Sequence, residues 1–106
     1  MEIRAASGTH DFPFFVLEHD GEIVGSGGYR VTGDVGELLE GTIRPDLRRK
    51  GLGRFLLLYR LRQMEGVAVV TVTTAAEHAG FYESQGFRVA EAGDPTRLVK
   101  KMNVCA

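Results

Sequence analysis

The stretch Arg44–Leu61, RPDLRRKGLGRFLLLYRL, restricts the fold and function of this chain more than any other. It joins a basic, glycine-containing segment directly to an apolar run at residues 55–59. Residues 44–62 contain seven of the chain's 13 lysines and arginines, although the net charge is only −1. The end of a solvated helix needs far fewer cations, so the segment is predicted to hold an anion.

Acidic residues gather in the preceding part of the chain. Residues 1–43 contain eight carboxylates, against only Arg4 and Arg30 as cations. This segregation indicates an anionic partner for residues 44–62. For residues 1–43 it indicates either a cationic partner or an ordinary solvated surface, and both interpretations stay open.

Length and composition are typical of one small globular domain, and a single domain over residues 1–106 is predicted. Cys105 is the one cysteine, so an internal disulfide is impossible, and no Cys/His spacing is typical of a zinc site. The first residues lack the apolar core of a signal peptide, and no apolar run approaches the roughly 18 residues of a membrane span. We therefore expect a cytoplasmic protein with no metal ion and no membrane contact.

The first half of the chain predicts four strands. Residues 2–6 form a short candidate, and residues 14–31 have the pattern of a hairpin whose turn is the dipeptide Asp20-Gly21. Another strand is expected at residues 36–43. Gly41 interrupts its pattern, which indicates either a bulge or a close backbone approach.

A helix is expected next, from about Lys50 to Glu65, ending at Gly66. Because residues 55–59 are apolar without a break, little of the middle of this helix is expected to face water. The β-branched residues 67–74 then predict a strand that is buried on both faces, as in a parallel sheet.

The last third predicts a second helix and two closing strands. Thr74 and Glu77 have the spacing of a capping box, and Gly86 stands where a left-handed cap would end the helix. Residues 87–92 and 96–104 are typical of a strand pair. The whole order predicts an α/β (α+β) fold with a mixed, mainly antiparallel sheet and helices packed on it.

The glycines of the basic segment suggest what kind of anion it holds. The start of a helix leaves backbone N–H groups without intrahelical acceptors, and a missing Cβ lets a diphosphate approach the main chain. Neither the Walker pattern GxxxxGK[ST] nor the dinucleotide fingerprint GxGxxG is present. Nucleic acid is not expected as a partner, because no nucleic-acid module is recognisable and the net charge is slightly negative.

Two motifs resemble those of the GNAT superfamily of acyl-CoA-dependent N-acetyltransferases. In TIRPDLRRKGLGRFLL, Arg48 takes the first position of the family's motif A, (Q/R)-x-x-G-x-(G/A), and Gly51 and Gly53 are its two small residues. GFYESQGFRV resembles motif B, with Phe81-Tyr82 and Gly86-Phe87 in register. The resemblance covers roughly residues 14–103 and implies a GNAT-like fold whose sheet is splayed at the central strands.

The resemblance implies acetyl-CoA as the acyl donor. In the family, the segment matching residues 49–54 wraps the CoA diphosphate, and the strand matching Gly41–Ile43 pairs its backbone with the pantetheine arm. A bulge at Gly41 would help to splay the sheet there. The residues implied in cosubstrate binding are Gly41, Thr42, Ile43, Arg48, Arg49, Lys50, Gly51, Leu52, Gly53 and Arg54.

The resemblance also implies catalytic residues. Tyr82 matches the motif B tyrosine that offers its hydroxyl to the departing sulfur, whereas Phe81 is expected in the core. Glu37 aligns with a position where some members carry a catalytic glutamate. Glu40, His78 and water stay open as alternatives for the base.

The implied function is N-acetyl transfer from acetyl-CoA to a primary amine of a small molecule or peptide by direct attack. The sequence departs from the family in two places: Ala75 replaces a common asparagine, and only GTHD stands where two helices usually precede the second strand. The absence of these helices implies an open acceptor site, a very small surface for acceptor specificity, or cover supplied by a second subunit, and we expect a homodimer. The alternative is a non-catalytic acyl-CoA-binding module with a degenerate acceptor site.

Overall fold

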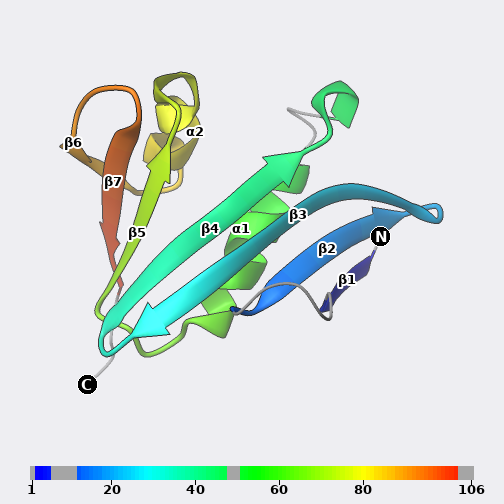
Figure 1. The fold of residues 1–106 in the computed structure, drawn as a ribbon, viewed down its shortest axis with the longest axis horizontal. Helices are drawn as coiled ribbons and strands as arrows, with labels where there is room; N and C mark the ends of the chain where they lie inside the picture. Colours follow the sequence, from blue (N-terminus) through cyan, green and yellow to red (C-terminus); the bar gives the residue numbers. More distant parts are fainter. Residues whose placement is uncertain (1, 6–11, 48–50, 103–106) are drawn as a thin grey trace. The chain divides into compact units, whose positions relative to one another are not determined.

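The computed structural model describes residues 2–5, 12–47 and 51–102, and of Glu40 the backbone only. Figure 1 shows the described elements along the chain. Their order is β1 (Glu2–Ala5), β2 (Phe14–His19), β3 (Glu22–Thr32), β4 (Val35–Ile43), η1 (Pro45–Leu47), α1 (Leu52–Gln63), β5 (Val69–Thr74), η2 (Ala76–His78), α2 (Ala79–Ser84), β6 (Arg88–Glu91) and β7 (Thr96–Lys101). The predicted order of strands and helices is confirmed, and the 3₁₀ turns η1 and η2 are additions to it.

The strands neighbour one another in the order β1-β2-β3-β4-β5-β7-β6. Strand β4 is parallel to β5, with Val35–Leu38 opposite Val69–Val72. The recorded pairs β1–β2, β2–β3, β5–β7 and β6–β7 are antiparallel. A mixed, mainly antiparallel sheet is therefore confirmed, whereas the splay of its central strands stays a prediction.

The chain divides into two compact units. The first consists of Met1–Arg30 and Leu39–Gln63, and the second of Val31–Leu38 and Met64–Ala106. Strands β3 and β4 contribute residues to both. The single N-acetyltransferase-like domain expected over residues 1–106 stays a prediction.

In the first unit, helix α1 buries one face only. Its buried residues are Leu52, Leu56, Leu57, Arg60 and Leu61. Phe55 and Leu58 are 48% and 44% exposed, so the prediction that the middle of this helix would be shielded from water is wrong. A period of 3.6 residues turns these two side chains away from the buried stripe, however apolar the run is.

In the second unit, β5 is buried on one face. Val70 and Val72 are almost fully buried, whereas Thr73 is exposed. The prediction of burial on both faces is wrong because the other face of the strand carries Thr71, which is half-buried, and Thr73, which is exposed. The closing pair of strands is confirmed, since β6 pairs with β7.

The second helix begins differently from the prediction. Thr74 pairs with Thr96 in the β5–β7 ladder, and the turn η2 begins after Ala75, whose own side chain makes no capping hydrogen bond. The capping box of Thr74 and Glu77 is therefore wrong, because Thr74 belongs to the strand. The carboxylate Oδ1 of Asp94, distant in sequence, accepts a hydrogen bond from the Ala76 N–H at 3.2 Å.

Replacing Asp94 with alanine is expected to destabilise the second unit modestly. The change removes the acceptor at the start of η2, and loss of such a cap lowers the free energy of unfolding by about 0.5–1 kcal/mol. Thermal unfolding followed by circular dichroism measures the effect. Asp94→Asn keeps the acceptor oxygen and is the matched control. Equal midpoints for Asp94→Ala and the wild type would contradict a capping role.

Candidate functional site

The predicted anion site lies in the first unit, between the end of β4 and the start of α1. The Arg44 N–H donates to the Val24 carbonyl at 2.8 Å, and the Leu47 N–H donates to the Arg44 carbonyl at 2.9 Å. These bonds hold the chain where it leaves β4 and forms η1. Gly51 then precedes α1 with φ +82°.

One apolar cluster holds both sides of this segment. Leu17, Val24 and Leu52 are buried together, and partly buried side chains packed against them include Ile43 and Leu47. Ile43 and Leu47 precede the basic segment, and Leu52 follows it. The cluster therefore fixes where the first turn of α1 begins.

The first turn of α1 has the chemistry of an anion site. The Phe55 N–H donates to the Gly51 carbonyl at 3.0 Å, so the N–H groups of residues 52–54 precede the first bond of the helix and have no acceptor within it. No acidic residue lies in this turn, and Arg54 is exposed in it. A Cβ at Gly51 would meet no described atom within 4 Å, so no described side chain crowds this position.

Three of the predicted binding residues, Arg48, Arg49 and Lys50, lie outside the described residues. Their contact with phosphate stays a prediction. Gly51, Leu52, Gly53 and Arg54 are all described at the start of α1. The contact of their backbone amides with a diphosphate stays a prediction.

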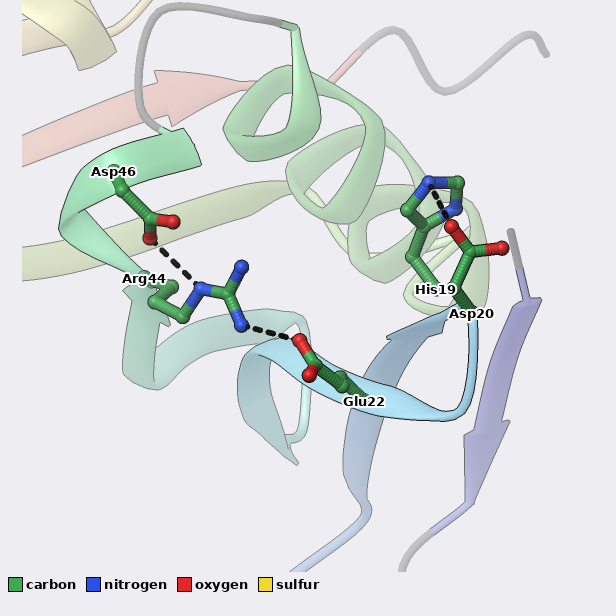
Figure 2. Close-up of polar contacts among 5 residues, drawn as sticks. All are labelled: His19, Asp20, Glu22, Arg44 and Asp46. Atoms are coloured by element: carbon green, nitrogen blue, oxygen red, sulfur yellow. Dashed lines mark hydrogen bonds and ion pairs between the residues drawn. The ribbon is translucent and has the colours of Figure 1, made fainter.

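Arg44 belongs to the basic stretch but is already engaged by carboxylates. Figure 2 shows its guanidinium between Glu22 and Asp46: Nη1 donates to Glu22 Oε2 at 2.8 Å, and Nε donates to Asp46 Oδ1 at 2.7 Å. The hydrogen bond to Glu22, followed by that to Asp46, raises the pKa of Arg44 above its ordinary value. The charge of Arg44 thus ties the start of β3 to the end of β4.

Figure 2 also shows a second pair of side chains, at the β2–β3 turn. His19 Nε2 lies 3.3 Å from Asp20 Oδ2.

Arg60 is a second cation of the stretch with an internal role, because it is only 3% exposed. A Cβ at Gly41 would lie 3.0 Å from its Nη2. At Gly41 it is thus a side chain of α1 that approaches closely, and not a backbone as predicted, whereas the alternative of a bulge stays a prediction. Sequence reasoning missed this residue, although its spacing from Leu56 and Leu57 places it on the buried face of the helix.

The two binding residues that follow Gly41 differ in burial. Thr42 is exposed, whereas Ile43 is partly buried in the cluster that anchors α1. Their contact with a pantetheine arm stays a prediction.

Tyr82, in the second unit, comes from α2. Gly86 N–H donates to the Glu83 carbonyl at 3.1 Å and Phe87 N–H to the Tyr82 carbonyl at 3.1 Å, which is a Schellman motif with Gly86 at φ +95°. The predicted left-handed cap is confirmed. The half-buried ring of Tyr82 packs edge-on against Phe81 and Phe87, with centroids 5.1 and 5.6 Å away.

The aromatic neighbours of Tyr82 differ from the expectation. Phe81 is 37% exposed, so its prediction as a core residue is wrong, and Phe87 at 3% is the buried ring. The short helix α2 buries none of its own residues and is held to the unit by the chain that follows it. Within the described part of the chain, no hydrogen bond reaches the Tyr82 hydroxyl.

The candidate bases occupy different surroundings. Glu37 is half-buried on β4, opposite Thr71 of β5. His78 is exposed, with Nε2 3.7 Å from Glu77 Oε1. The side chain of Glu40 lies outside the described residues. Tyr82, Glu37 and His78 belong to the second unit, whereas the start of α1 belongs to the first.

The described residues contain neither a metal centre nor a membrane-spanning helix. No group of three or more His, Cys, Asp or Glu side chains among them is arranged to hold a metal ion. None of the helices formed by these residues has the length and apolar character needed to cross a membrane.

Several solved structures share this fold at low sequence identity. PaiA N-acetyltransferase of Thermoplasma acidophilum, in complex with coenzyme A, has a TM-score of 0.76 at 23% identity, over 84% of this chain and 60% of its own. The ribosomal-protein-S18-alanine N-acetyltransferase of Escherichia coli has a TM-score of 0.75 at 23% identity, over 93% and 74%. N-acetylglutamate synthase of Neisseria gonorrhoeae, complexed with coenzyme A and N-acetyl-glutamate, has a TM-score of 0.75 at 20% identity, over 86% and 26%. This chain thus spans less than two thirds of the first of these proteins and about a quarter of the last.

A search among curated protein sequences gave no match. Residues 10–89, however, match the acetyltransferase (GNAT) domain family. The match includes both motifs on which the resemblance rests, the segment leading into α1 and the helix that carries Tyr82. The chain therefore belongs to the GNAT acetyltransferase domain family.

Proposed function

We propose that this chain is an N-acetyltransferase, an enzyme that moves the acetyl group of acetyl-CoA to a primary amine of a small molecule or peptide. The observation that carries the proposal is the start of α1. There Gly51 precedes a first helical turn that contains no acidic residue and whose N–H groups have no acceptor within the helix. In a chain of the GNAT family, the diphosphate of CoA is the anion that suits this site.

The proposed cosubstrate contacts follow the chain from β4 into α1. The backbone of Gly41–Ile43 pairs with the pantetheine arm of acetyl-CoA. The amides of Gly51–Arg54 bind the diphosphate, and Arg48, Arg49 and Lys50 add positive charge. No acidic side chain in the first turn of α1 opposes this binding.

The proposed reaction is direct aminolysis of a thioester. The neutral amine attacks the carbonyl carbon, the C–S bond breaks, and CoA leaves as a thiolate, so no acyl-enzyme forms. Tyr82 gives its phenolic proton to the thiolate and regains one from solvent. Glu37 takes the proton released by the amine, with Glu40, His78 and water as the alternatives.

The alternative function is a non-catalytic acyl-CoA-binding module. Residues 6–13 alone separate β1 from β2, where the family usually has two helices over the acceptor site. Thiol release from acetyl-CoA, measured against polyamines, aminoglycosides, amino acids and peptide N-termini, separates the two functions. We expect release that depends on one class of amine. CoA binding without release from any amine would favour the binding module, and absence of CoA binding would contradict both.

The predicted homodimer is supported by two apolar side chains that α1 exposes, Phe55 and Leu58. We expect a dimer-sized peak in size-exclusion chromatography with light scattering at micromolar concentration. The double variant Phe55→Ser, Leu58→Ser is expected to shift that peak towards the monomer. Ile23→Ser, which changes another exposed apolar residue of the same unit, is the control. A monomer-sized peak for the wild type would contradict the dimer.

A further inference from the structure

The guanidinium of Arg60 joins α1 to two strands of the first unit. Nη1 donates to the Gly28 carbonyl of β3 at 3.2 Å and lies 3.5 Å from the Leu39 carbonyl of β4. The residue is 3% exposed. A buried cation is tolerated only where polar groups surround it, so these carbonyls and the guanidinium hold one another in place.

Two glycines make room for this side chain. A Cβ at Gly27 of β3 would lie 2.9 Å from Arg60 Cζ, and a Cβ at Gly41 of β4 would lie 3.0 Å from Nη2. Any larger residue at either position would displace the guanidinium. Lysine would not replace it, because an ammonium is a compact charge and lacks the planar guanidinium that lies against Gly27 and Gly41 while Nη1 contacts both carbonyls.

We propose that Arg60 is a positioning residue for the pantetheine arm of acetyl-CoA. It contacts β4 at Leu39 and Gly41, and the segment Leu39–Ile43 that begins there contains the backbone proposed to pair with the arm. The amides proposed to bind the diphosphate lie about 10 Å further along the helix, at 1.5 Å per residue. Arg60 therefore controls affinity for the arm and leaves affinity for the diphosphate unchanged. This inference rests on the proposed function.

Two ligands separate this role from a general loss of structure. Isothermal calorimetry compares CoA with adenosine 3′-phosphate 5′-diphosphate, the part of CoA that lacks the arm. For Arg60→Lys we expect CoA to bind about tenfold or more weakly, with less than about a twofold change for the fragment. The control Arg62→Lys changes an exposed arginine of the same helix and is expected to alter neither affinity.

The outcomes distinguish the inference from the function on which it rests. Equal weakening of both ligands by Arg60→Lys, or no weakening of either, overturns the positioning role while the proposed function stands. Failure of the wild type to bind CoA overturns the proposed function and this inference with it. Circular dichroism melting sets the temperature at which every variant is folded.

Gly27→Ala tests the same role from the side of β3, should Arg60→Lys fail to fold. The three atoms nearest to its methyl group would all belong to the Arg60 guanidinium, so we expect the change to act on β4 through that group. We expect selective weakening of CoA by Gly27→Ala, and loss of this effect in an Arg60→Met background. The same weakening in both backgrounds would overturn the inference.

Discussion

Gly51→Val is expected to weaken acetyl-CoA binding by about 100-fold. A β-branched residue at φ +82° is strained by about 1–2 kcal/mol, so the turn relaxes and moves the amides that follow it. Loss of a single charge-assisted hydrogen bond to the diphosphate costs about 1.5–3 kcal/mol of binding free energy. This loss corresponds to roughly one to two orders of magnitude in Kd, measured by isothermal calorimetry, whereas the strain itself lowers the stability of the chain.

Gly66→Val is the matched control for this variant. Gly66 also has a positive φ, +101°, and a Cβ there would also meet no described atom within 4 Å. It follows the end of α1, away from the first turn, so we expect a comparable loss of stability with unchanged affinity. Equal weakening of acetyl-CoA by both variants would show that strain alone, and not the cradle, explains the effect of Gly51→Val.

Tyr82→Phe is expected to lower kcat by about 100-fold at unchanged KM for acetyl-CoA, because it removes a proton donor that acts only as the thiolate leaves. The fold should be preserved. The ring packs through its edge contacts with Phe81 and Phe87, which do not need the hydroxyl. Steady-state thiol release gives both constants.

Tyr59→Phe is the control for the loss of a phenolic hydroxyl. Tyr59 is half-buried and packs edge-on against Phe15, with centroids 5.2 Å apart, so its ring surroundings resemble those of Tyr82. We expect its kcat to equal that of the wild type. An unchanged kcat for Tyr82→Phe would remove Tyr82 as the acid and leave the thiolate to be protonated by solvent.

Much of the fold could be predicted from the sequence because it depends on neighbouring residues. Asp20-Gly21 forms a tight turn since both residues adopt positive φ, +52° and +79°. Gly86 ends α2 for the same kind of local reason. Two glycines after a run of cations predicted where α1 starts. That its first backbone amides lack acceptors follows from helix geometry alone.

Some of what was missed concerns contacts between residues distant in the sequence. Arg44 and Arg60 belong to the basic stretch, but partners from β3 and β4 occupy both, in addition to the nearby Asp46 that binds Arg44. Asp94 caps η2 although it lies 18 residues beyond Ala76 in the sequence, too far for a local sequence pattern to indicate it. A charge count along the sequence therefore overstates how many cations are free to meet an anion.

Carboxylates of residues 1–43 also find partners within the folded chain. Arg4 donates to Glu18 Oε2 through Nε and Nη2, at 3.0 and 2.8 Å, and Glu22 accepts from Arg44. These carboxylates have cations of their own chain as partners. The number of carboxylates in residues 1–43 is thus a poor indication that the acceptor is a cation. Amines whose remaining groups are uncharged or carry a carboxylate therefore belong in the acceptor panel.

The central claim is that the first turn of α1 binds the diphosphate of acetyl-CoA. The most direct measurement is a ¹H–¹⁵N correlation spectrum of the labelled chain during titration with adenosine 3′-phosphate 5′-diphosphate. We predict that the amide resonances of Leu52, Gly53 and Arg54 shift more than others in the chain, because these N–H groups gain an acceptor on binding. Unmoved resonances for these three amides, at concentrations where calorimetry reports a saturated site, would contradict the claim.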